Sequence, residues 1–125
     1  MSEFLYKTDT YKIIGICMQV YNTLGYGFAE IVYIDAMELE FLEKEVDYLR
    51  EDELQINYKG HILKHSFYAD FIIHQNIIVE VKSHKDGITD DMVAQTLNYL
   101  KASGIKLGLI INFGKASLEY KRLIY

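Results

Sequence analysis

The chain has 125 residues, and its 13 Lys and Arg against 18 Asp and Glu give a formal net charge of −5. Half of the residues are hydrophobic, which excludes a disordered chain, and the single Cys17 excludes a disulfide scaffold. A chain of this size buries roughly two-thirds of its unfolded surface, enough for one hydrophobic core. The sequence therefore predicts one globular domain over residues 1–125.

The apolar segments are short and the charge is acidic. No apolar run approaches the ~18 residues that a membrane span requires. Residues 1–7 lack a basic segment followed by a long apolar core, so no signal peptide is expected. We expect a cytoplasmic protein without membrane contact. The negative charge argues against binding nucleic acid by bulk charge, but it allows an enzyme that meets phosphate through a metal ion.

Two helices are predicted in the first part of the chain. Apolar residues recur at spacings of three and four from Thr10 to Leu24, with a cap predicted among residues 8–10. The segment Gly25-Tyr26-Gly27 ends this helix. A second helix is predicted from Phe28 to Glu45. Its buried stripe is formed by Ile34, Met37 and Phe41.

The pattern then changes to that of strands. Residues from Val46 to Tyr58 and from His61 to His74 are rich in Val, Ile, Tyr and Leu, and Lys59-Gly60 between them predicts a hairpin. A second turn at Gln75-Asn76 leads into a strand over Ile77–Lys82. Apolar residues alternate onto both faces of this strand, which is typical of a central strand covered on both sides.

The last part of the chain returns to a helix and then a strand. Thr89 or Asp90 caps a helix that ends near Ser103-Gly104, and an apolar strand follows over Ile105–Phe113. Residues Leu118–Tyr125 suit a short edge strand. The predicted order is α-α-β-β-β-α-β with a final β. This order indicates an α/β fold with a mixed sheet flanked by helices, including a parallel βαβ unit.

Two acids lie inside apolar strands. Asp70 and Glu80 each have Ile, Val or Phe nearby on both sides in the sequence. An unpaired buried carboxylate costs several kcal/mol, so each acid needs a partner or a metal. The short turn at Gln75-Asn76 places the two acids opposite each other on neighbouring strands. Two carboxylates this close repel unless a cation lies between them, and Mg²⁺ prefers such oxygen ligands.

Lys82 lies two residues after Glu80, on the same face of the strand. An ammonium beside a carboxylate–metal site can orient a water or stabilise developing charge. The pattern therefore suggests metal-assisted hydrolysis of a phosphodiester. The competing interpretation is an exposed Glu80–Lys82 charge pair, with Asp70 bonded to nearby backbone or to a lysine.

Three residues on the predicted helices complete the candidate set. Gln95 and Tyr99 are four residues apart, so they share one helix face that follows the Glu80–Lys82 strand. Alternatively, Tyr99 is a core residue and Gln95 a boundary residue. Glu30 falls in the first turn of the second helix, where it could also complement the helix dipole.

Together these motifs resemble the GxxExxY proteins, small prokaryotic members of the PD-(D/E)xK nuclease superfamily. The likeness covers roughly residues 12 to 125. The motifs that carry it are Gly27-x-x-Glu30-x-x-Tyr33, Tyr68-Ala69-Asp70-Phe71, Ile78-Val79-Glu80-Val81-Lys82, Gln95-x-x-x-Tyr99-Leu100 and Leu109-Ile110-Ile111-Asn112-Phe113-Gly114.

The resemblance implies a restriction-endonuclease-like core and a set of site roles. Asp70 and Glu80 would bind Mg²⁺, with Mn²⁺ as a substitute, and the backbone carbonyl of Val81 would join them. Lys82 would assist the attacking water, and Glu30 would complete the metal environment directly or through water. The pair Gln95 and Tyr99 is similar to the helix motif of the RecB-like branch, where it supports the site and the substrate strand.

The expected function is a Mg²⁺-dependent nuclease acting on nucleic acid, with DNA favoured over RNA. No basic stripe is present in the sequence, so a second copy of the chain or a protein partner could supply part of the groove. Two alternatives stay open. One is a non-catalytic nucleic-acid-binding or assembly module that keeps the fold, and the other is a metal-dependent hydrolase of a different phosphate.

Overall fold

A computed structural model describes residues 6–125. The chain forms a mixed five-stranded sheet in the order β1-β2-β3-β4-β5, in which β3 and β4 are parallel and the other neighbours antiparallel. The element order and the parallel βαβ unit are as predicted, and the final strand is present. The elements are α1 (Lys7–Leu24), α2 (Glu30–Glu43), β1 (Tyr48–Tyr58), β2 (His61–Ile73), β3 (Ile77–Lys82), α3 (Asp90–Ser103), β4 (Leu107–Asn112) and β5 (Glu119–Ile124).

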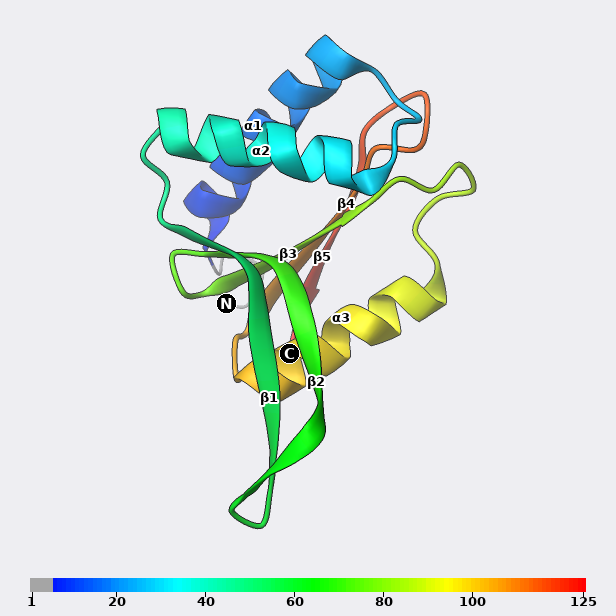
Figure 1. Cartoon of the computed structure of the whole chain (residues 1–125). Helices are drawn as coiled ribbons and strands as arrows, with labels where there is room; N and C mark the ends of the chain where they lie inside the picture. The colour runs from blue at the N-terminus through cyan, green and yellow to red at the C-terminus, as the bar shows by residue number, and fades with distance from the viewer. Residues whose placement is uncertain (1–5) are drawn as a thin grey trace.

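The helices lie on both faces of the sheet (Figure 1). Helices α1 and α2 cover one face and α3 covers the other, so two separate apolar clusters form. Strands β3 and β4 are buried almost throughout, which explains their apolar residues on both faces. Within residues 6–125, no helix has both the length and the apolar content needed to cross a membrane.

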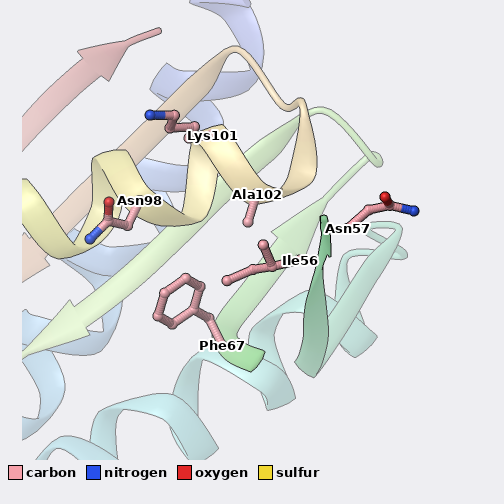
Figure 2. A pocket seen from close by; sticks show the side chains of 6 residues that line it. All are labelled: Ile56, Asn57, Phe67, Asn98, Lys101 and Ala102. Carbon is pink, nitrogen blue, oxygen red and sulfur yellow. The ribbon is translucent and has the colours of Figure 1, made fainter. Parts of the chain in front are cut away.

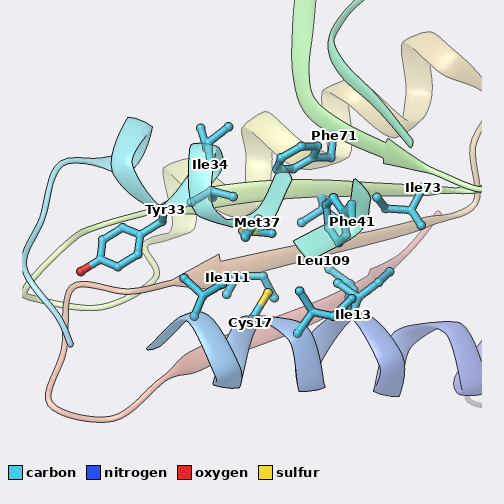
Figure 3. Close-up of a cluster of buried hydrophobic side chains, with 14 of the residues drawn as sticks. Ile13, Cys17, Tyr33, Ile34, Met37, Phe41, Phe71, Ile73, Leu109 and Ile111 are labelled. Carbon is cyan, nitrogen blue, oxygen red and sulfur yellow. The ribbon is translucent and has the colours of Figure 1, made fainter. Parts of the chain in front are cut away.

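The larger cluster fills the space between the sheet and helices α1 and α2 (Figure 3). The predicted stripe of α2 is buried here: Ile34, Met37 and Phe41 are at most 6% exposed. Cys17 of α1 is fully buried, and this burial raises the pKa of its thiol to about 12. Cys17 is therefore an unreactive core residue.

Both helices of the first part begin at other residues than predicted. Helix α1 begins at Lys7, because the carbonyl of Tyr6 accepts a hydrogen bond from the N–H of Thr10. No cap lies among residues 8–10. Helix α2 begins at Glu30 instead of Phe28. The reason is tertiary, since the N–H of Phe28 donates to the Tyr33 hydroxyl and is not part of a helical turn.

The other boundaries shift by a few residues where the backbone adopts left-handed conformations. Glu45 has φ 55°, and α2 ends before it at Glu43. His74 and Gln75 have φ 53° and 63°, so the turn after β2 begins one residue early. Helix α3 has its predicted ends. The Thr89 hydroxyl accepts from the Met92 N–H at 3.2 Å, and Gly104 is left-handed at φ 77°.

Candidate active site

The β1–β2 hairpin changes faces at Glu51 and Asp70. Ala69 and Phe71 are two residues apart in β2, yet Ala69 belongs to the cluster under α3 and Phe71 to the cluster under α1 and α2. A regular strand would place both on one face. Glu51, opposite Asp70 in the register, has a left-handed φ of 53°. This kink interrupts the strand alternation at the position that carries the first candidate acid.

Beyond the paired part of β2 and β3, the side chains of the two candidate acids take the place of backbone–backbone hydrogen bonds. Strand pairing ends at Phe71 and Val79, one residue before Asp70 and Glu80 would pair. From there the Asp70 N–H donates to Glu80 Oε2 at 2.8 Å. The Val81 N–H donates to Asp70 Oδ2, also at 2.8 Å. The carboxylates therefore lie next to each other, as the short turn predicts, and each uses one oxygen to hold the partner strand.

Burial makes this pair of carboxyl groups reluctant to ionise. Glu80 is 3% exposed, and burial followed by the charge of Asp70 raises its pKa to about 8. Burial also raises the pKa of Asp70, against the opposing effects of the Val81 N–H and Lys82. A cation between the two groups would remove this repulsion. Their oxygen donors are of the type that Mg²⁺ and Mn²⁺ bind, so the residues fit a divalent metal.

Lys82 connects β3 to α3. Its Nζ donates to Gln95 Oε1 at 2.9 Å, so the predicted strand and helix motifs meet. The interpretation of Glu80 and Lys82 as an exposed charge pair is wrong, because Glu80 is buried. The same interpretation also expected Asp70 to be bonded to nearby backbone, and this part is correct, because Asp70 Oδ2 accepts a hydrogen bond from a backbone N–H. Gln95 orients the ammonium of Lys82 beside the acids.

Tyr99 lies one turn after Gln95 on α3, within electrostatic reach of the acids. It is 7% exposed, and its ring centroid is 5.1 Å from that of Phe67 in β2. Burial, followed by the charges of Glu80 and Asp70, raises the pKa of its hydroxyl to about 12. Tyr99 is thus both a member of the smaller core, as the alternative expected, and a neutral hydrogen-bond donor near the carboxylates.

Glu30 lies within electrostatic reach of the acids but outside their hydrogen-bonded pair. It begins α2, is exposed, and its charge contributes to the raised pKa values of Asp70 and Glu80. Among residues 6–125, no three Asp, Glu, His or Cys side chains converge as a metal cage. Any contribution of Glu30 therefore acts at longer range, and its place in the first turn of α2 also suits the helix dipole.

Tyr33 holds the loop that precedes Glu30. Its hydroxyl donates to the Gly25 carbonyl at 2.8 Å and accepts from the Phe28 N–H at 3.1 Å. Its ring stacks on Phe113 at 4.2 Å between centroids. The Ser83 hydroxyl donates to the Phe28 carbonyl, which ties the same loop to the end of β3. The third residue of the Gly27–Glu30–Tyr33 motif is therefore a positioning residue.

We expect Tyr33→Phe to lower the free energy of unfolding by about 1–2 kcal/mol, because two polar backbone groups lose their partner. Tyr26→Phe is the matched control, since Tyr26 is 59% exposed, and it should change stability by less than about 0.5 kcal/mol. Thermal denaturation of both variants measures the difference. Equal melting temperatures would show that the Tyr33 hydroxyl does not hold this loop.

The sequence interpretation missed a clamp next to Lys82. The Asn112 side chain is fully buried and accepts from the N–H groups of His84 and Gly114 at 2.8 and 3.0 Å. Its amide donates to the His84 carbonyl and to Glu119 Oε1. The sequence signal for this clamp was a polar residue at the end of an apolar strand, two residues before a glycine. Glu51, which also raises the pKa of Asp70, gave no signal beyond its charge.

Comparisons with known proteins agree with this geometry. The sequence model described as the PD-(D/E)XK nuclease superfamily matches residues 7–123. No curated protein matches the chain. The solved structure titled "Crystal structure of SSO0001" is 19% identical, with a TM-score of 0.57 over 74% of this chain and 48% of that one. The chain thus spans about half the length of that structure, and the likeness shows the fold. Because the family match covers nearly all of the described residues, the chain belongs to the PD-(D/E)XK nuclease superfamily, with its restriction-endonuclease-like fold.

Proposed function

We propose that this chain is a metal-dependent nuclease that hydrolyses phosphodiester bonds in nucleic acid, with DNA favoured over RNA. The observation that supports it most is the pair of cross-strand hydrogen bonds, from the Asp70 N–H to Glu80 and from the Val81 N–H to Asp70, that holds the two acids together near Lys82. Carbonyl oxygens could accept from the same two N–H groups, so these hydrogen bonds alone do not account for the costly burial of two adjacent carboxyl groups. Within the superfamily, the Gly27–Glu30–Tyr33 and Gln95–Tyr99 motifs support assignment to the GxxExxY proteins and the RecB-like branch.

Asp70 and Glu80 would hold the divalent metal through carboxylate oxygens, with the Val81 carbonyl as a third donor and Glu30 acting through water. Mg²⁺ commonly binds one or two carboxylates and keeps its other positions for waters and substrate phosphate, so a cage of three side chains is not required. When bound, the metal supplies Lewis-acid chemistry, activating water and neutralising phosphate charge.

The other residues of the site act on the water and the phosphate. Lys82, oriented by Gln95 at 2.9 Å, places a positive charge where negative charge develops during attack. Tyr99 keeps its proton at neutral pH, since its pKa is raised to about 12, and can donate a hydrogen bond to the substrate strand. Together they bind and orient the groups that react.

The test is cleavage of labelled single- and double-stranded DNA and RNA with Mg²⁺ or Mn²⁺. We expect Asp70→Ala and Lys82→Ala to lower the rate by at least about 10²–10³-fold, as the loss of a charge-stabilising group does. The matched control is Lys12→Ala, which removes an exposed lysine from α1 and should leave the rate unchanged.

Cleavage that is equal in all four proteins would indicate a contaminating nuclease. Absence of cleavage under every condition would contradict the catalytic proposal. The non-catalytic binding module would then be the better account of the fold.

A further inference from the structure

A cavity of about 460 Å³ lies between the far half of the β1–β2 hairpin and α3 (Figure 2). Phe67 and Ile56 project into it from the hairpin, and the Ala102 methyl group points toward Ile56 from the helix, with Asn98 one turn away. The residues that line it are Ile56, Asn57, Phe67, Asn98, Lys101 and Ala102. The kink at Glu51 and Asp70 turns this part of the hairpin toward α3 and so forms the cavity.

The lining suits a flat aromatic group that carries a negative charge. Phe67, Ile56 and Ala102 give apolar surface, and the Asn98 amide offers both a donor and an acceptor. Lys101 adds a positive charge, and the lining that residues 6–125 provide contains no carboxylate. A second groove, on the β1 side of Ala102, contains Asp52 and Glu53 and would repel an anion. Charge therefore favours the first cavity for a nucleotide.

The cavity is continuous with the proposed catalytic site. Gln95, Asn98 and Ala102 are separated by three and four residues, so they follow one face of α3. The ring of Phe67 lies 5.1 Å from the ring of Tyr99, and Gln95, one turn before Tyr99 on α3, accepts from Lys82 Nζ at 2.9 Å. A group in the cavity would thus lie beside the residues of that site.

We propose that this cavity binds an unpaired base of the nucleic-acid strand, next to the phosphate that the acids would act on. The proposal rests on the proposed nuclease function and specifies its substrate class as a single strand or a single-stranded end. A base in a duplex is stacked and has its pairing edge occupied, so it cannot enter without leaving the helix. Stacking on Phe67 and hydrogen bonding to Asn98 would hold the base, with little dependence on sequence.

The test measures binding separately from cleavage. A single-stranded DNA pentamer with central 2-aminopurine is titrated with protein in Ca²⁺, and the emission of the base and the anisotropy of an end label are recorded. The same pentamer sequence within a hairpin duplex is the paired probe. The protein variants are Ala102→Phe, which fills the cavity, Phe67→Leu, which removes its ring, and the control Leu39→Phe, which places a ring on the exposed side of α2, across the sheet from α3.

We expect the wild type and Leu39→Phe to bind the single strand alike, with a change in base emission, and to bind the duplex at least about 10-fold more weakly. Ala102→Phe and Phe67→Leu should each weaken single-strand binding by about 10-fold or more, within the range of base–aromatic stacking. Thermal melting confirms that the variants are folded. The two variants change the cavity in different ways. Weaker binding by both is therefore attributed to loss of the cavity and not to movement of Tyr99.

Equal binding by Leu39→Phe and Ala102→Phe, equal binding of the single strand and the duplex, or no binding at all would overturn the proposal. Cleavage is measured in parallel with Mg²⁺ on the same oligonucleotides. Cleavage without cavity-dependent binding would leave the nuclease function standing and remove the base site. Cavity-dependent binding without cleavage would support the base site and contradict catalysis.

Discussion

Gly114→Ala is expected to destabilise the chain by about 3 kcal/mol or more, a large share of the stability of a small domain. A Cβ at this position would lie 2.3 Å from the backbone N of His84 and 2.5 Å from its carbonyl carbon. Neither atom can move without disturbing the Asn112 hydrogen bonds to the N–H and C=O of the same residue. The backbone of β3 and the end of β4 must therefore separate, which also displaces the segment that follows Lys82.

Gly15→Ala is the matched control, because the same methyl group is added elsewhere. Gly15 lies in the middle of α1 and is exposed, and an added Cβ meets nothing within 4 Å. Alanine favours the helix over glycine by roughly 0.5–1 kcal/mol, so this variant should be more stable than the wild type. Urea denaturation gives both values. A Gly114→Ala protein as stable as the wild type would show that the contact with His84 is not tight.

Much of the fold could be predicted because local patterns and tertiary environment agree in the central elements. Strands β3 and β4 carry apolar residues on both faces and are covered on both faces. Helix α3 has the capping residue Thr89 at one end and left-handed Gly104 at the other. Where burial, propensity and capping point the same way, the pattern is a reliable guide.

The features that could not be predicted depend on particular side-chain contacts, some local and some between distant residues. The start of α2 depends on Tyr33 and Phe28, and the clamp at Asn112 depends on His84, 28 positions away. The left-handed Glu51 has no sequence signal, because the residues that favour this conformation are Gly, Asn and Asp. Yet at this kink the Asp70 N–H donates its hydrogen bond to Glu80, and the hairpin turns toward α3. The candidate residues stood out in the sequence by their type, whereas the contacts that support them did not.

The pH dependence of stability gives a second large effect. In the metal-free protein, Glu80 keeps its proton up to about pH 8, whereas in the unfolded chain it loses the proton near its ordinary pKa of 4.5. Between these values the folded state binds more protons than the unfolded state, so the free energy of unfolding falls as the pH rises. One pKa unit corresponds to about 1.4 kcal/mol, which predicts a fall on the order of 5 kcal/mol between pH 4.5 and 8. The raised pKa of Asp70 acts in the same direction.

Glu80→Gln and added metal test the cause of this fall. The glutamine oxygen can still accept the Asp70 N–H, as Glu80 Oε2 does at 2.8 Å, but the side chain has no proton to lose. We expect urea denaturation in EDTA to show a much shallower pH dependence for Glu80→Gln and higher stability than the wild type at pH 8. Mn²⁺ should stabilise the wild type increasingly as the pH rises, because it binds the ionised pair, and should not stabilise the variant to the same extent. A wild-type stability that stays level from pH 5 to 8 without metal would mean that the two carboxyl groups are better solvated than the hydrogen-bonded arrangement allows. The proposed metal site would then lose its main physical argument.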